Sequence, residues 1–253
     1  MMKVRVLSFG VLKDWLGGGA AIVELAEGAT VGTLLERLST GKAGPWPRQR
    51  LRGIAVSVNS EFATPAHVLC EGDEVGLLPP GSGGSSASAS DSGQTAVDRA
   101  VTIALTRAPI EAEGLVSAAK RGEDGAVVVF DGIVRNNSRG RQTLYLDYEA
   151  YEELAVKQMR QLVEQAIERF GIRDALIVHR LGRLHVGETS VLIVVAAAHR
   201  GPAFEASRWL IDTLKKTVPI WKKETFVDGA VWAAGEAFPA GMAVTPPEAS
   251  HEE

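Results

Sequence analysis

The sequence has 253 residues, of which 45% are hydrophobic and 23% charged, and its mean hydropathy is +0.04. These values exclude a collagen, a coiled coil and a fully disordered chain, and they allow one large domain or two smaller ones. A single cysteine, Cys70, excludes an intramolecular disulfide and a multi-cysteine zinc site. The N-terminal residues do not fit a secretory signal and no apolar stretch is long enough to span a bilayer, so we expect a cytoplasmic protein without a membrane partner.

The formal net charge of −4 is unevenly distributed along the chain. Residues 1–84 hold eight basic and eight acidic residues, and the acidic excess comes from Asp91, Glu248, Glu252 and Glu253. The two portions expected to fold are therefore neutral. A neutral surface argues against a nucleic-acid partner, because phosphate backbones are bound mainly by basic surfaces.

The first portion of the chain predicts a small mixed sheet packed on one main helix. Two early segments alternate apolar and polar residues, a third has apolar residues at helical spacing, and two later apolar runs predict further strands. The expected elements are strands at 4–8, 21–25, 54–58 and 75–78 and a helix at 31–38 with Thr30 as its N-cap. The apolar residues before Cys70 predict that its side chain is buried.

A boundary follows at residues 81–93, where ten of thirteen residues are Gly or Ser. Such a run cannot recover its ordering entropy by burial, so it predicts a linker spanning roughly 20 Å. We expect one domain over 1–84, a linker over 85–96, a second domain over 97–239 and a flexible tail over 240–253.

The second portion has the pattern of an α+β domain. It combines apolar or alternating runs, typical of strands, with two amphipathic segments that predict helices. The expected strands lie at 126–130, 144–150, 176–178 and 191–197, and the expected helices at 155–170, ended by Gly171, and from Pro202 to before Pro219.

The densest charge cluster lies between His199 and Lys223 and has a net charge of +4. One of several crowded lysines can lose its proton and act as a nucleophile or base, while the others hold an anion such as phosphate. The alternative is a solvated lysine face at a helix C-terminus, which composition alone favours. The cluster consists of Arg200, Arg208, Lys215, Lys216, Lys222 and Lys223, opposed only by Glu205 and Asp212.

Other candidate sites are weaker. The loop at 131–141 carries Arg135, Arg139 and Arg141 and is either a phosphate cradle or an ordinary polar hairpin loop. His179 fits a hydrogen-bonded structural histidine better than a catalyst. No metal-ligand spacing, nucleophile elbow, P-loop or dinucleotide fingerprint occurs, which excludes the commonest hydrolases, NTPases and dinucleotide enzymes.

Residues 1–84 resemble MoaD, the β-grasp sulfur-carrier subunit of molybdopterin synthase. The resemblance rests on residues 4–10, the turn at 72–75 and the tail from Pro79-Pro80 to Gly83-Gly84. Residues from about 101 to 238 resemble MoaE, the catalytic subunit. The matching segments are 130–136, 148–151, 179–182, 187–188, 198–200, 204–206, 214–215, 219–224 and Trp232.

The resemblance implies an α+β protein in which a ubiquitin-like β-grasp domain precedes an α/β-hammerhead-type MoaE-like domain. The implied sulfurtransferase activity builds the dithiolene of molybdopterin on cyclic pyranopterin monophosphate, with no permanently bound cofactor or metal. The sulfur would arrive as a thiocarboxylate on Gly84, loaded by a MoeB-like adenylating enzyme. The implied assembly is a homodimer through the MoaE-like domain, or a heterotetramer if the chain is cleaved.

The resemblance also assigns site residues. Lys215 takes the position of the lysine implicated in covalent or base chemistry, and Lys222 that of its essential neighbour. The matching substrate-anion binders are Arg135, His199 and Arg200, and the residues that match the lining of the same pocket are Ile133, Val134, Lys223 and Glu224.

One feature departs from the family pattern. A carrier glycine is a free C-terminus, whereas Gly84 is followed by Ser85 and has no carboxylate to adenylate. We therefore expect cleavage after Gly84. An uncleaved chain would favour a non-catalytic scaffold that tethers a carrier to a pterin-binding partner, and a protein-modifying ubiquitin-like conjugate would also use Gly84.

Intact-mass spectrometry of the native protein tests this expectation. We expect two fragments that meet at the Gly84–Ser85 bond, because only a freed Gly84 carboxylate can be activated. A single uncut species with full synthase activity would contradict the expected cleavage.

Overall fold

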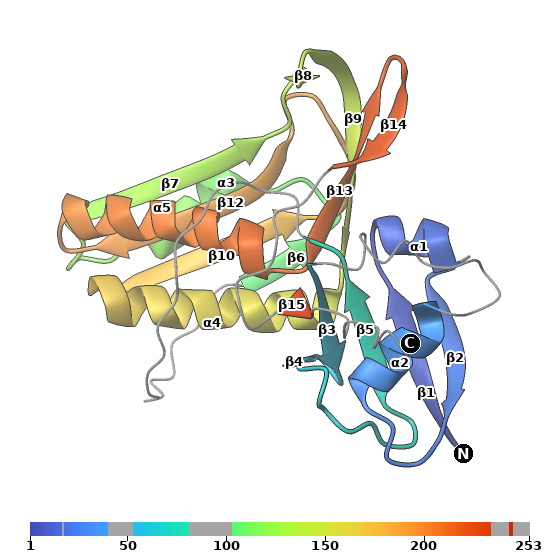
Figure 1. The fold of residues 1–253 in the computed structure, drawn as a ribbon. Coiled ribbons are helices and arrows are strands. Elements are labelled where there is room, and N and C mark those ends of the chain that lie inside the picture. Colours follow the sequence, from blue (N-terminus) through green and yellow to red (C-terminus); the bar gives the residue numbers. More distant parts are fainter. Residues whose placement is uncertain (17, 40–52, 81–102, 234–242, 245–253) are drawn as a thin grey trace. The chain divides into compact units, whose positions relative to one another are not determined.

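The structure is a computed structural model that describes residues 1–16, 18–39, 53–80, 103–233 and 243–244 (Figure 1). The described residues form two compact units, one from 1–80 with 243–244 and the other from 103–233. Both units combine helices with sheets, so the predicted α+β class is confirmed. Gly84 and the expected linker at 85–96 lie outside the described residues.

The first unit is a sheet in the order β15-β3-β5-β1-β2, with β4 paired to β3. The central strands β1 and β5 are parallel, and their neighbours are antiparallel. This is the predicted mixed sheet of a β-grasp domain. The elements are β1 (Met2–Ser8), α1 (Val11–Leu16), β2 (Ala20–Leu25), α2 (Val31–Ser39), β3 (Ile54–Val58), β4 (Glu61–Ala63), β5 (Glu74–Leu78) and β15 (Ala243–Val244).

The core of this unit follows from residue alternation. Along β1 the buried residues Met2, Val4 and Val6 alternate with exposed ones, and they pack against the apolar face of α2. The N–H of Thr33 donates to the Thr30 side chain, so Thr30 caps α2 as predicted. Ala243 and Val244, which fall in the segment expected to be a tail, pair with β3.

The prediction that Cys70 is buried is wrong. Its side chain is exposed, as is that of Val68, while Leu69 between them is buried. The extended backbone alternates its side chains, so burying Leu69 turns both neighbours outward.

The second unit contains a four-stranded sheet in the order β6-β10-β12-β7 and a second sheet in the order β11-β9-β13-β14, with β8 paired to β9. The strands of the first sheet are β6 (Ile103–Thr106), β7 (Ala126–Ile133), β10 (Asp174–Arg180) and β12 (Thr189–Ala197). The other elements are α3 (Ala112–Ala119), β8 (Asn137–Ser138), β9 (Arg141–Ala150), α4 (Glu152–Phe170), β11 (Gly182–His185), α5 (Arg200–Thr217), β13 (Ile220–Phe226) and β14 (Gly229–Trp232).

Strand β12 is apolar from Val191 to its end because both faces of its sheet are covered (Figure 1). Ile193 and Val195 face the core shared with α4 and α5, whereas Leu192 and Val194 face α3. Helix α4 ends where Gly171 adopts the left-handed conformation and its N–H donates to the Ile167 carbonyl, as predicted. Helix α5 begins at Arg200, two residues before the predicted start, because Pro202 is tolerated in a first turn.

None of the helices in the described ranges combines the length and the apolar character that a membrane crossing requires.

Candidate active site

An ion pair between a partly buried lysine and a buried glutamate on β13 forms the centre of the candidate site. The strand alternates its side chains, so Lys222 and Glu224 lie on one face, and Lys222 Nζ is 3.1 Å from Glu224 Oε1. Glu224 is 7% exposed, and a carboxylate at that depth requires a charged or hydrogen-bonding partner. Lys222 provides that partner and is itself held in one position by it.

Strand β9 places Tyr148 opposite Lys222 in the antiparallel register. Burial raises the pKa of the Tyr148 phenol, a hydrogen bond with Ser190 acts in the opposite direction, and the negative charge of Glu224 raises it further. Tyr148 is therefore a neutral phenol at physiological pH. Ser190 is fixed in turn, because its hydroxyl donates to the Gly132 carbonyl at 2.7 Å.

His179 closes the buried side of this cluster. Its ring lies edge-on to the Tyr148 ring with the centroids 5.1 Å apart, and its Nδ1 is 2.9 Å from the Arg180 carbonyl oxygen. Burial lowers the pKa of His179 to about 4, so the imidazole is neutral at pH 7. The structure thus agrees with the structural role expected for this residue.

Residues 133–135 enter the site from the end of β7. Val134 is buried against Leu146 and Leu184 with Tyr148 packed beside them, whereas Ile133 and Arg135 are exposed. The Val134 N–H donates to the Glu188 carbonyl at 3.0 Å, and its own carbonyl accepts from the Gly187 N–H at 2.8 Å. These bonds fix the backbone from which Arg135 emerges.

The carboxylate of Glu188 stabilises the same turn. It accepts the His185 N–H at 2.6 Å and lies 3.0 Å from Arg180 Nη1. The hydrogen bond from His185 lowers the pKa of Glu188 most, and the hydrogen bond from Arg180 lowers it further. The turn that supports Arg135 is therefore stabilised by an ion pair as well as by hydrogen bonds.

Lys215 reaches this region from the last turn of α5, as predicted, and is exposed. Strand β12 ends where Ala197 pairs with Ala126, the first residue of β7, and α5 then returns along both strands (Figure 1). The C-terminus of α5 thus lies at the Ile133 end of β7. Lys215, Lys222 and Arg135 consequently belong to one end of the domain.

His199 and Arg200 lie at the opposite end. Arg200 is the first residue of α5 and Lys215 comes fifteen residues later, so the two positions are roughly 22 Å apart along the helix axis. Both His199 and Arg200 are exposed. A single chain therefore does not bring these two predicted anion binders together with Lys215.

Two more predicted site residues lie apart from the ion pair. Lys223 is on the other face of β13 from Lys222, and its Nζ is 5.7 Å from the centre of the Trp232 ring. Gly84 falls outside the described residues, so its predicted role stays a prediction. In the described part of the chain, no group of three or more His, Cys, Asp or Glu side chains could hold a metal ion.

Comparison with known proteins assigns the two units. The family described as MoaE protein matches residues 105–217, and the ThiS family matches residues 6–84. The molybdopterin synthase catalytic subunit of Pyrococcus abyssi is 47% identical over 126 residues, which are 50% of this chain and 83% of that protein. The chain belongs to the MoaE family of molybdopterin synthase catalytic subunits. Its ThiS-family region confirms the predicted fusion.

A second curated relative agrees with this assignment. The catalytic subunit of Bacillus subtilis is 38% identical over 141 residues, which are 54% of this chain and 90% of that protein. The crystal structure of molybdopterin synthase from Staphylococcus aureus is 39% identical with a TM-score of 0.49, covering 51% of this chain and 93% of that one.

Sequence reasoning missed the two hydroxyl groups next to the Lys222–Glu224 ion pair, those of Tyr148 and Ser190. Tyr148 was assigned only to the predicted strand at 144–150 and to the family resemblance, and Ser190 lies one residue before the strand predicted at 191–197 and was given no role. A hydroxyl near the start of an otherwise apolar run was the available signal, since a buried hydroxyl needs a partner.

The buried imidazole predicts a pH dependence of stability. As the pH falls from 6.5 to 4, the unfolded chain binds a proton at His179 while the folded chain does not. The free energy of unfolding should therefore fall by about 3 kcal/mol through this group alone. Urea denaturation should show that His179→Gln removes this part of the slope.

Identical slopes for wild type and His179→Gln would contradict the depressed pKa of His179.

Proposed function

We propose that the chain is a molybdopterin synthase that transfers sulfur from a Gly84 thiocarboxylate to cyclic pyranopterin monophosphate. The observation that carries the proposal is the partly buried Lys222–Glu224 ion pair at the Lys215 end of a MoaE-family domain, in a chain that also has a ThiS-family region. Each transfer consumes one thiocarboxylate and returns a Gly84 carboxylate. The dithiolene requires two transfers.

The two lysines have different surroundings and, we propose, different roles. Lys222 is held by Glu224, so its ammonium group is fixed beside the neutral phenol of Tyr148. It is suited to stabilising negative charge on the reacting group. Lys215 is exposed at the helix end and free to approach the substrate, so it is the candidate for the covalent or base step.

The anion of the substrate requires a second set of cations. Arg135 lies at the Lys222 end of the domain, whereas His199 and Arg200 lie roughly 22 Å away from Lys215 in the same chain. A homodimer resolves this separation if the His199 and Arg200 of one copy complete the site of the other. The isologous contact of such a dimer forms two equivalent sites.

The supply of sulfur requires a partner. A glycine carboxylate becomes a thiocarboxylate only after activation, so we propose a MoeB-like adenylating enzyme as the partner that loads Gly84, with both proteins in the cytoplasm. The competing scaffold function needs neither cleavage nor loading, and a chain that remains intact in its active form would favour it.

Replacement of Lys215 tests the proposed chemistry. Lys215→Ala should reduce dithiolene formation by about 100-fold or more. The folded state should be little affected, since an exposed lysine contributes within about 0.5 kcal/mol to stability. The assay measures molybdopterin formed from cyclic pyranopterin monophosphate and thiocarboxylated carrier.

Lys216→Ala is the matched control, because it removes the same charge from the same helical turn. Equal activities of the two variants would contradict the role of Lys215.

A further inference from the structure

The corner between β12 and α5 carries His199 and Arg200 without a local cap. His199 is the N-cap residue of α5, and its side chain makes no capping hydrogen bond. Both side chains are exposed. Their positions therefore depend on what holds the backbone of residues 196–198.

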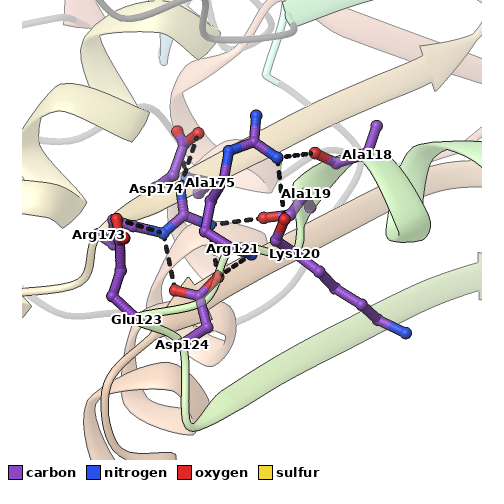
Figure 2. A network of polar contacts seen from close by, with 9 residues as sticks. All are labelled: Ala118, Ala119, Lys120, Arg121, Glu123, Asp124, Arg173, Asp174 and Ala175. Atoms are coloured by element: carbon purple, nitrogen blue, oxygen red, sulfur yellow. Dashed lines mark hydrogen bonds and ion pairs between the residues drawn. The ribbon is translucent and has the colours of Figure 1, made fainter.

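A buried ion pair lies beside this corner. Arg173 donates from Nε to Asp124 Oδ1 and from Nη2 to Asp124 Oδ2, both at 2.7 Å, and Figure 2 shows the guanidinium facing the carboxylate. The side chains of Arg173 and Asp124 are 19% and 4% exposed. A bidentate pair at this depth is strong and directional. Arg173 Nη2 also donates to the Ala119 carbonyl, and Asp124 accepts the Arg121 N–H at 2.8 Å.

The two loops joined by this ion pair both bond to the end of β12. The Arg173 N–H donates to the Ala196 carbonyl at 3.0 Å, and the Gly125 N–H donates to the Ala197 carbonyl at 3.1 Å. Gly125 is packed so closely on Ala198 that a Cβ at position 125 would collide with the Ala198 carbonyl oxygen. Three successive residues before His199 are thus fixed by the loops that carry Asp124 and Arg173.

We infer that Arg173, Asp124 and Gly125 are positioning residues for the substrate anion, because they set the place of His199 and Arg200. They touch no substrate themselves. The inference rests on the proposed function, in which His199 and Arg200 bind that anion. Loss of the ion pair should loosen the corner and weaken substrate binding while leaving the chemistry at Lys215, at the other end of α5, unchanged.

Steady-state kinetics of the full chain test the inference. Arg173→Met should raise the KM for cyclic pyranopterin monophosphate about ten-fold and leave kcat within about two-fold, because misplacing a binding group costs affinity. Gly125→Ala should have the same effect by a different route, through its collision with Ala198. Asp124→Asn provides a third variant in case either of these fails to fold.

Arg183→Met is the matched control. Arg183 makes a similar bidentate pair with Asp147, at 3.0 and 3.2 Å, but joins β11 to β9 and has no bond to the end of β12 among the described contacts. Its KM should equal that of the wild type.

The histidine signals in the NMR spectrum provide a readout that does not depend on activity. The His199 ring signal should shift in Arg173→Met and in Gly125→Ala, whereas the His67 signal, from the other unit, should not. A lowered unfolding temperature with an unchanged KM and an unchanged His199 signal would mean a merely structural role and would overturn the inference.

Arg200→Ala separates this inference from the proposed function. If Arg200→Ala raises the KM and Arg173→Met does not, the inference is wrong and the proposed function stands. If Arg200→Ala leaves the KM unchanged, the proposed anion site is wrong, and the inference about substrate binding fails with it.

Discussion

Helix α5 sets the distance on which the proposed catalytic centre depends. It is a rigid rod of 18 residues with His199 and Arg200 at its start and Lys215 in its last turn. A helix cannot shorten to bring its ends together. If all three residues serve one substrate, as we propose, the anion binders must come from a second copy, and the proposed chemistry then depends on the proposed dimer.

The two ends of α5 are held in different ways. At the Lys215 end, the Lys222–Glu224 ion pair sits over Tyr148 and Ser190, so the fixed charge lies within the site itself. At the Arg200 end, the ion pair of Arg173 and Asp124 is next to the corner between β12 and α5. It positions Arg200 only indirectly, through hydrogen bonds to the backbone of β12. In both arrangements an ion pair holds in place either a cation of the site or the backbone that carries one.

Much of this could be predicted from the sequence where local chemistry decides the structure. Thr30 caps α2 and Gly171 ends α4 because these residue types satisfy the helix termini, and Lys215 fell in the last turn of its helix as expected. Elsewhere, residues that are close in the sequence were wrongly expected to be close in space. The cluster from His199 to Lys223 is one run of charge in the sequence, but the helix within it separates the two groups.

Other features depended on contacts that local patterns do not encode. The pairing of Lys222 with Tyr148 follows from the register between β13 and β9, and the pair of Asp124 with Arg173 joins loops far apart in the chain.

The most direct test of the central claim is to mix Lys215→Ala chains with Arg200→Ala chains after joint refolding and to measure synthase activity. At a substrate concentration well below the KM, where sites that lack Arg200 are nearly empty, a site shared between two copies predicts recovery to about a quarter of the wild-type activity, since half of the dimers are mixed and each has one intact site. A mixture no more active than the separate variants would contradict a shared site.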